Sequence, residues 1–301
     1  MPADPAAPPP PPQTPHWRVR GRTLPLDRPF VLGIVNVTPD SFSDGGTHAD
    51  VASAVAHAER LLDEGADGVD VGGESTRPRN GGPVPAGEEI ARVLPLVAAV
   101  RARRPGALIS IDTNKGAVAR AALDAGADVV NDVSGFRLDP ELPAACRAAD
   151  AGVILMHSRG RVADMATLAH AEYGADPVGE VVAELGEALD RARAAGISDE
   201  AIVLDPGIGF AKRSVHSLAV LASLQRVAAL GRPVLVGASR KRLIGELTGV
   251  AEPARRVAGS VGAHVAALAR GARLFRVHDV RAHREALDAA WAILGDGANA
   301  P

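Results

Sequence analysis

Polar residues of the kinds that bind or react with ligands recur in this chain directly after short apolar runs. Residues 31–37 are mostly apolar and β-branched, and the stretch that follows is polar and Gly-rich. In α/β proteins, sites are built where a buried strand ends in such a loop before a helix. An ordinary turn is the alternative for residues 36–46 alone, because Asn, Asp and Ser favour turns. The same change recurs later, which favours a site: at Asp70, Asp112, Asn131 with Asp132, His157, Asp205, the turn 237–242, and Arg276 with His278.

Two carboxylates and an amide form the first candidate constellation. Asp112, Asn131 and Asp205 follow three of the apolar runs. The carboxylates would accept hydrogen bonds from ring and amino N–H groups, and the amide can donate or accept. The set would suit a ring such as an aminopyrimidinone. The alternative is that Asp112 and Asp205 cap the following helices, as Asp often does. For Asp112 alone the two interpretations are even, but for the set a ligand is favoured.

Cationic residues form the second group. Residues 237–242, GASRKR, lie at a predicted helix N-terminus, where free N–H groups and the helix dipole attract anions. The chain otherwise uses arginine, so the retained Lys241 indicates a need for a compact point charge. The same argument applies more weakly to Lys212. Lys115 is interpreted as a solvated surface lysine.

Arg276 and His278 alternate with apolar residues near the C-terminal end of the chain. Alternation along a strand sends both side chains the same way, which predicts a cationic pair for phosphate or diphosphate. For His278 alone the alternative is a satisfied core histidine. Asn36 and neighbouring oxygens could hold Mg²⁺, which prefers oxygen ligands and substrate phosphates. No HExxH or Cys/His spacing indicates a zinc site.

The loop 72–85, GGESTRPRNGGPVP, is polar and rich in Gly and Pro. These features predict a mobile lid over the substrate. Thr76 and Arg77 are its candidate contacts.

Strands and helices alternate eight times along the chain. Strands are predicted at 30–36, 68–72, 108–112, 128–132, 152–157, 202–205, 233–237 and 272–277. Helices are predicted at 51–64, 86–104, 115–125, 140–149, 176–195, 216–230, 254–270 and 281–294. Such alternation favours a parallel sheet, and eight repeats in about 270 residues match a (β/α)₈ TIM barrel. A doubly wound open sheet is the alternative, but no GxGxxG follows the first strand.

The N-terminal segments are expected to lie outside the barrel proper. Residues 1–15 are rich in Pro and Ala and lack the basic start and apolar core of a signal peptide, so a disordered tail is expected. Residues 16–28 predict a short hairpin that closes one end of the barrel. Residues 16–301 are therefore predicted to form a single domain.

Composition excludes several classes of protein. The net charge of −3 and the pI of about 6.3 leave no basic footprint for nucleic acid. No apolar run approaches the length of a membrane span. The single cysteine, Cys146, excludes an intramolecular disulfide and fits a reducing, cytoplasmic compartment. Its Ala-rich surroundings indicate a buried helical side chain rather than a nucleophile.

The motifs in order resemble those of one known family. VLGIVNVTPDSFSDGG, DVGGESTRP, SIDT, VNDVSG, LMH, DPGIGFAK, GASRK and RVHDV closely resemble dihydropteroate synthases, and the match covers about residues 17–295. The resemblance implies a transferase of folate synthesis, usually a homodimer. It would join p-aminobenzoate to 6-hydroxymethyl-7,8-dihydropterin diphosphate and release diphosphate.

The resemblance also implies roles for individual residues. The pterin would be held by Asp112, Asn131, Asp205 and Lys241. Mg²⁺ would bind at Asn36, and the diphosphate would bind at Arg276 and His278, with Arg276 also packing on the pterin ring. The p-aminobenzoate pocket would include Thr76, Pro78 and Phe210. The C–O bond to diphosphate would break first, and the arylamine would then attack the cationic methylene without a strong general base. Arg79 and Arg242 depart from the family pattern near the expected p-aminobenzoate end.

Two rival readings remain from sequence. A pterin-dependent methyltransferase would share the carboxylates but has no use for GASRK and RVHDV. A catalytically silent paralogue would bind pterin or a partner only. The presence of Asn36, Lys241, Arg276 and His278 argues against it.

Overall fold

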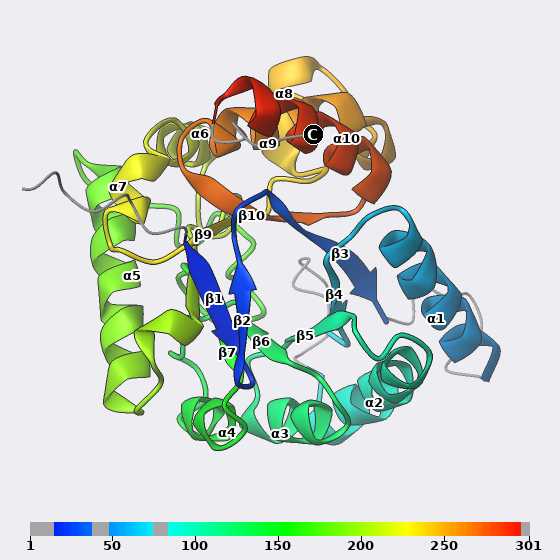
Figure 1. The fold of residues 1–301 in the computed structure, drawn as a ribbon. Helices are drawn as coiled ribbons and strands as arrows, with labels where there is room; N and C mark the ends of the chain where they lie inside the picture. The colour runs from blue at the N-terminus through cyan, green and yellow to red at the C-terminus, as the bar shows by residue number, and fades with distance from the viewer. Residues whose placement is uncertain (1–14, 38–47, 75–83, 296–301) are drawn as a thin grey trace, which may run out of the picture.

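A closed barrel of parallel strands forms the body of the molecule. The structure is a computed structural model that describes residues 15–37, 48–74 and 84–295. Within these residues eight parallel strands close in the order β10-β3-β4-β5-β6-β7-β8-β9, and helices surround them (Figure 1). Because the last strand, β10, pairs with the first barrel strand, β3, the sheet has no open edge. The predicted TIM barrel is therefore confirmed, and the doubly wound sheet is excluded.

Most predicted bounds agree with the structure to within a few residues. The strands are β1 His16–Val19, β2 Arg22–Pro25, β3 Phe30–Asn36, β4 Gly68–Gly72, β5 Leu108–Asp112, β6 Val129–Asp132, β7 Gly152–Met156, β8 Ile202–Asp205, β9 Val234–Val236 and β10 Ala272–Val277. The α-helices are α1 His48–Asp63, α2 Ala86–Arg103, α3 Gly116–Asp124, α4 Leu142–Ala148, α5 Pro177–Ala194, α6 Ser214–Ala222, α7 Leu224–Ala228, α8 Arg242–Thr248, α9 Val257–Leu268 and α10 Val280–Ile293. Two 3₁₀ turns, η2 Asp199–Ala201 and η3 Pro253–Arg255, complete the described elements.

Two predicted helices differ from those observed. The helix expected over 216–230 is divided into α6 and α7, because Ser223 leaves the helical conformation with φ −125° and ψ 31°. The helix expected over 254–270 begins only at Val257, after the 3₁₀ turn that opens with Pro253. Both breaks lie on the outer ring and leave the strand order unchanged.

The N-terminal hairpin plugs one end of the barrel. β1 and β2 pair antiparallel and lie across the ring of strands in Figure 1. Trp17 is fully buried, its Nε1 donates to the carbonyl of Ala201 at 2.9 Å, and its ring meets Phe30 edge-on. The hairpin side chains pack on an apolar layer inside the barrel, formed by Leu32, Leu108, Val129, Ile154, Val203, Leu235 and Leu274. The predicted closure by the hairpin is confirmed.

The strand residues that alternate with this inner layer face the helices. Alternate positions such as Val69, Ile109 and Leu204 belong to the large apolar cluster that joins the strands to the helical ring. Cys146 lies buried in α4 and, as predicted, is a packed side chain; burial raises the pKa of its thiol. In the described part of the chain, no helix has both the length and the apolar character needed to cross a membrane.

Candidate active site

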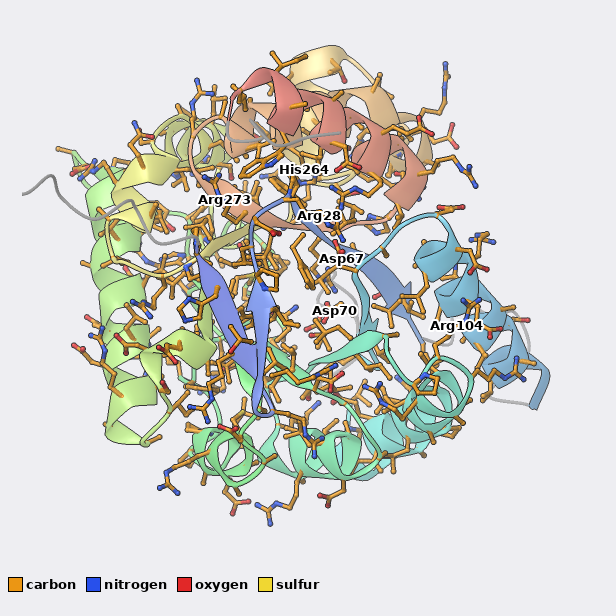
Figure 2. All side chains as sticks on the ribbon, in the orientation of Figure 1. Arg28, Asp67, Asp70, Arg104, His264 and Arg273 are labelled. Carbon is orange, nitrogen blue, oxygen red and sulfur yellow. The ribbon has the colours of Figure 1, made fainter. Side chains whose placement is uncertain are left out.

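Charged and amide side chains form an inward layer at the C-terminal ends of the strands. Each of these side chains lies two positions after another inward-facing residue of its strand, so the alternation of side chains along a strand points it into the barrel as well. The five residues are Asp70, Asp112, Asn131, Asp205 and Arg276. Figure 2 shows Asp70 inside the ring of strands and Arg104 at the helical periphery. The predicted constellation of Asp112, Asn131 and Asp205 is brought together at one end of the barrel.

Arg276 bridges two carboxylates within this layer. Its Nε donates to Asp70 Oδ2 and its Nη2 donates to Asp112 Oδ2, the latter at 2.8 Å. Asn131 Nδ2 donates to the same Asp70 oxygen at 3.0 Å. Asp70 is fully buried, and within the described residues its Oδ1 has no hydrogen-bond partner. Sequence reasoning noted Asp70 as a strand end but gave it no role, although a charge in the middle of GVDVG was the available signal.

Burial sets the ionisation of the layer. Burial raises the pKa of Asp112 to about 7, Arg276 opposes the shift, and the Asp70 charge adds to it. Burial also raises the pKa of Asp205, against the lowering effect of the Lys241 ammonium. The pKa of Lys241 falls to about 8, again because of burial, although Asp205 favours its charged form. Asp112 and Lys241 are therefore two groups of the mouth whose pKa values are shifted toward neutral pH by burial.

The two aspartates do not cap helices. The N-cap residue of α3 is Lys115 and that of α6 is Arg213. Asp205 Oδ1 instead accepts the Gly207 N–H at 2.7 Å, within the turn that follows β8. The helix-cap alternative for Asp112 and Asp205 is therefore wrong, because each carboxylate is used inside the barrel mouth.

Lys241 and Phe210 meet across this mouth. The Lys241 Nζ lies 4.3 Å from the centroid of the Phe210 ring and donates to the carbonyl of Ile208. A cation over an aromatic face is attracted by the ring quadrupole. The loop after β8 and the turn after β9 thus contact each other through these two predicted site residues.

Arg276 and His278 have separate partners. Arg276 turns between the carboxylates, whereas His278 Nδ1 lies 3.0 Å from Ser239 Oγ, which also accepts the His278 backbone N–H. Arg240, at a left-handed φ of 59°, forms an ion pair with Asp279 and so ties the two turns together. The GASRK motif predicts no individual role for Ser239, because its contact with His278 joins segments that are 39 positions apart in the sequence.

Asn36 ends β3 and is exposed at the mouth. Its Oδ1 and Asp112 Oδ2 both face the space beside Gly72, since a Cβ on Gly72 would lie 3.7 Å from each. Among the described residues, no cluster of three or more His, Cys, Asp or Glu could hold a metal ion. An amide oxygen with one carboxylate fits Mg²⁺, which keeps waters and takes substrate phosphates, better than a metal that needs a full protein cage.

The structure describes only the two ends of the loop 72–85, here called loop two. Thr76, Arg77, Pro78 and Arg79 lie outside the described residues. Just before that gap, Glu74 Oε1 accepts the Val84 N–H at 2.7 Å. Lys115 pairs with Glu74 and Glu89, and its side chain is only 18% exposed, so its interpretation as a solvated lysine is wrong.

Arg242 and Lys212 lie at opposite extremes of exposure. Arg242 begins α8, is exposed and pairs with Glu246 at 3.2 Å. Lys212 is 1% exposed, so it is no open anion site. Its hydrogen-bond partners are internal.

A barrel mouth lined by buried carboxylates, an amide and two cations is suited to a ring that carries several N–H donors, and the comparison with known proteins identifies the family. The profile of the family described as "Pterin binding enzyme" matches residues 32–278. The dihydropteroate synthase of Neisseria meningitidis serogroup C is 44% identical over 282 residues, which cover 93% of this chain and 97% of the relative.

Two solved structures of Xanthomonas albilineans dihydropteroate synthase are also similar. The one with 4-aminobenzoic acid has a TM-score of 0.85 at 46% identity, covering 96% of this chain and 100% of that chain. The one with 7,8-dihydropteroate has a TM-score of 0.82 at 45% identity, covering 94% and 100%. This chain therefore belongs to the dihydropteroate synthases of the pterin-binding enzyme family.

Proposed function

We propose that this chain joins p-aminobenzoate to 6-hydroxymethyl-7,8-dihydropterin diphosphate, giving 7,8-dihydropteroate and diphosphate. The observation that carries the proposal is the buried layer of Asp70, Asp112, Asn131, Asp205 and Arg276 at the barrel mouth. The structures of the Xanthomonas albilineans relative with 4-aminobenzoic acid, a substrate of this reaction, and with 7,8-dihydropteroate, its product, support the same reaction.

Pterin binding follows from the hydrogen-bonding capacity of this layer. Asp112 and Asp205 would accept from the ring and amino N–H groups, and Asn131 would use its remaining amide capacity on the ring edge. Arg276, fixed by Asp70 and Asp112, would present its planar guanidinium to the ring. Holding the ring in a buried, prearranged layer reduces the reorganisation needed during reaction.

Cleavage of the C–O bond to diphosphate would leave a cationic methylene on the pterin. Lys241, Arg276 and His278 would offset the negative charge of the departing diphosphate, with His278 held by Ser239. The p-aminobenzoate amine then attacks the methylene carbon and loses one proton to solvent. Phe210, against Lys241, would form one wall of the p-aminobenzoate pocket, together with Thr76 and Pro78 of loop two.

Asn36 would bind Mg²⁺ through its amide oxygen, beside the Asp112 carboxylate. The ion would supply charge neutralisation to the diphosphate when bound. The orientation of the pterin by the aspartates, and its enclosure at the barrel mouth, belong to the chain itself.

The test is product formation from the two substrates by wild type and by Lys241→Ala. Wild type should form dihydropteroate and release diphosphate in equal amounts, with a requirement for Mg²⁺. Lys241→Ala should lose about 10²-fold or more in kcat/KM, because one charge-stabilising group is removed. Pterin binding without diphosphate release would indicate a silent paralogue, and no pterin binding would overturn the proposed function.

We also propose that the chain works as a homodimer in the cytoplasm. Val215 and Leu218 on α6 and Leu247 on α8 are large apolar side chains exposed on neighbouring helices. Clustered apolar surface of this kind marks protein interfaces, and the free, reduced Cys146 fits a reducing compartment. Sedimentation should give twice the chain mass for wild type and the chain mass for Leu218→Asp with Leu247→Asp. A monomeric wild type would contradict the dimer.

A further inference from the structure

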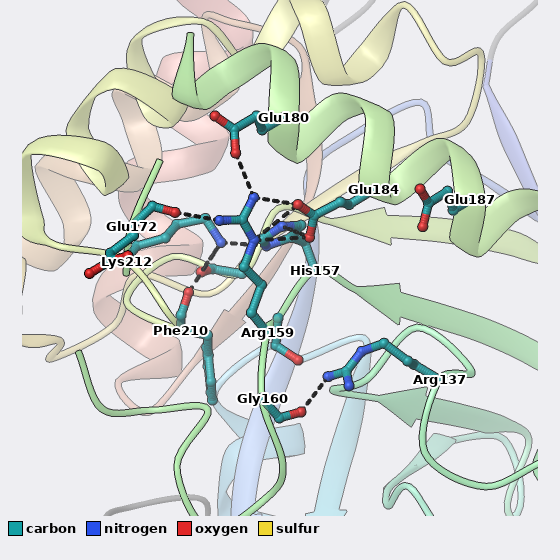
Figure 3. A network of polar contacts seen from close by, with 12 residues as sticks. Arg137, His157, Arg159, Gly160, Glu172, Glu180, Glu184, Glu187, Phe210 and Lys212 are labelled. Carbon is teal, nitrogen blue, oxygen red and sulfur yellow. Dashed lines mark hydrogen bonds and ion pairs between the residues drawn. The ribbon is translucent and has the colours of Figure 1, made fainter. Parts of the chain in front are cut away.

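A buried ammonium lies beneath the loop that follows β8. Lys212 is 1% exposed, and its Nζ lies 2.6 Å from His157 Nδ1, 3.1 Å from the Gly207 carbonyl and 3.2 Å from the Phe210 carbonyl (Figure 3). An ammonium has three N–H donors and no acceptor. The three neighbours are therefore a complete set of partners for a charged Lys212.

His157 connects this ammonium to an acidic helix face. If His157 Nδ1 accepts from Lys212, its proton is on Nε2, which lies 3.0 Å from Glu184 Oε2 in α5. Burial and the Lys212 charge lower the pKa of His157 to about 4, which keeps the imidazole neutral near pH 7. Placing the proton on His157 instead would use the same two hydrogen bonds. Burial lowers the pKa of Lys212 well below its usual value, against the opposing effect of the Asp205 and Glu184 carboxylates, and in both arrangements Nζ keeps hydrogens for the Gly207 and Phe210 carbonyls.

Arg159 fixes the far end of the chain of contacts. Its guanidinium donates to both Glu184 oxygens and to Glu180 Oε2, and it lies 4.0 Å from the centre of the Tyr173 ring. Burial acts to raise the pKa of Glu184, but hydrogen bonds from His157 and Arg159 outweigh it and hold that pKa at about 2. Figure 3 shows these side chains converging from α5 and from the loops after β7 and β8. Lys212, His157, Glu184 and Arg159 are thus joined in one series of contacts, here called the Lys212 anchor.

The two carbonyls held by Lys212 belong to the turn that carries the substrate groups. Gly207 donates its N–H to Asp205, and Phe210 carries the ring beside Lys241. Only glycine fits at the start of this turn: Gly207 has φ +67°, and a Cβ there would lie 1.9 Å from the His157 carbonyl oxygen. Lys241 holds the turn at the Ile208 carbonyl, and Lys212 holds it at the carbonyls on either side.

We propose that Lys212, which is hydrogen-bonded to His157 and through it to Glu184, is a positioning residue. It fixes the Gly207–Phe210 turn and so places Asp205 and Phe210 for the two substrates. The proposal rests on the proposed function for the identity of those substrates. Because Lys212 is 1% exposed, it acts on the substrates only through the turn, whose Gly207 and Phe210 carbonyls accept from its Nζ.

The test compares variants of this anchor with a matched cation at the other end of the barrel. Lys212→Met removes the ammonium. His157→Leu removes the side-chain acceptor of Lys212, whereas His157→Gln keeps an acceptor for Lys212 and a donor for Glu184. Arg101→Met is the control, because Arg101 is a cation that likewise donates to backbone carbonyls, but it lies near the N-terminal ends of the strands, where it pairs with Asp128.

Initial rates would be measured with each substrate varied, and the Kd of 7,8-dihydropteroate would be measured by calorimetry. A misplaced turn should lower kcat/KM by about 10-fold to 10²-fold in Lys212→Met, mainly through KM, with a matching rise in Kd. His157→Leu should follow Lys212→Met, and His157→Gln should stay close to wild type. Arg101→Met should lose thermal stability while its KM values stay unchanged.

The proposal is overturned if folded Lys212→Met keeps both KM values and the Kd within twofold of wild type. If Lys212→Met does not fold, the test rests on the variants His157→Leu and His157→Gln. Equal KM values in these two variants would exclude positioning of the turn through this anchor. A wild type that binds dihydropteroate but makes none would overturn the proposed reaction only, and the Kd comparison would still test Lys212. A wild type that binds no dihydropteroate would overturn both.

Discussion

The N-terminal and C-terminal ends of the barrel interior are both buried, yet one is apolar and the other is charged. At the first end, Trp17 and the hairpin cover a layer of Leu, Val and Ile side chains. At the second, Asp70, Asp112 and Asp205 surround Arg276, and burial raises the pKa of Asp112 and Asp205. Apolar burial contributes stability, whereas buried charge costs free energy unless partners offset it. We therefore expect the stability of the barrel to depend mainly on the hairpin end and ligand binding to depend on the mouth.

The largest expected effect is at the mouth. Asp205→Asn replaces an acceptor with an amide whose N–H can face a pterin N–H, so kcat/KM should fall at least about 10³-fold. The melting temperature should change little, since Asp205 pays a burial cost that Asn avoids. Steady-state kinetics and thermal melts would check both.

The control for this substitution is Asp128→Asn at the opposite end. Asp128 pairs with Arg22 and Arg101 and accepts the Ile109 N–H, so its loss should lower stability while kcat/KM is kept. Equal losses of activity in the two variants would contradict the division of the barrel into a stabilising end and a binding end.

The next effect is on stability alone. Trp17→Ala removes a fully buried indole and leaves the Ala201 carbonyl without its donor, so the free energy of unfolding should fall by about 3–5 kcal/mol. The kcat/KM of the protein that remains folded should stay near wild type, because the mouth is untouched. Urea unfolding and rates at a temperature below the melting transition would measure the two. A clear loss of kcat/KM in the protein that remains folded would show that the two ends of the barrel are coupled.

The smallest effect concerns the pH dependence of stability. The pKa of Asp112 is raised to about 7 in the folded state, so its contribution to stability is fully present below the unfolded value near 4 and is lost as pH rises through 7. The amide of the Asp112→Asn variant does not titrate and has no such dependence. The stability of wild type relative to Asp112→Asn should therefore fall by about 1–2 kcal/mol between pH 4.5 and pH 7.5. The change is limited because Arg276, which also pairs with Asp70, favours the charged form of Asp112.

Urea unfolding of both proteins at the two pH values would measure this difference. The low pKa of His157 gives a trend of opposite sign, but it is common to both proteins and cancels. A difference that grows with pH would mean that Arg276 stabilises the charged form of Asp112 beyond its burial cost.

Much of the fold could be predicted because its signals are local. Five strands have the bounds that their apolar runs predicted: Phe30–Asn36, Gly68–Gly72, Leu108–Asp112, Ile202–Asp205 and Ala272–Val277. Helices α6 and α7 were merged because the break at Ser223 depends on conformation and not on composition. Lys115 was misjudged because its partners, Glu74 and Glu89, lie on other elements.

The sequence by itself determined the alternation of strands and helices, the polar residues that end the strands, and the family to which they point. Periodicity and residue type are properties of short segments, so they can be read without a fold. Only the tertiary structure decided which of these residues meet. Closure of β10 on β3 places Arg276 against Asp70, 206 positions earlier in the chain. Burial beneath the β8 loop turns Lys212 from an apparent anion ligand into an internal anchor. Pairing, burial and the resulting pKa shifts depend on neighbours that are distant in sequence, and folding alone brings those neighbours together.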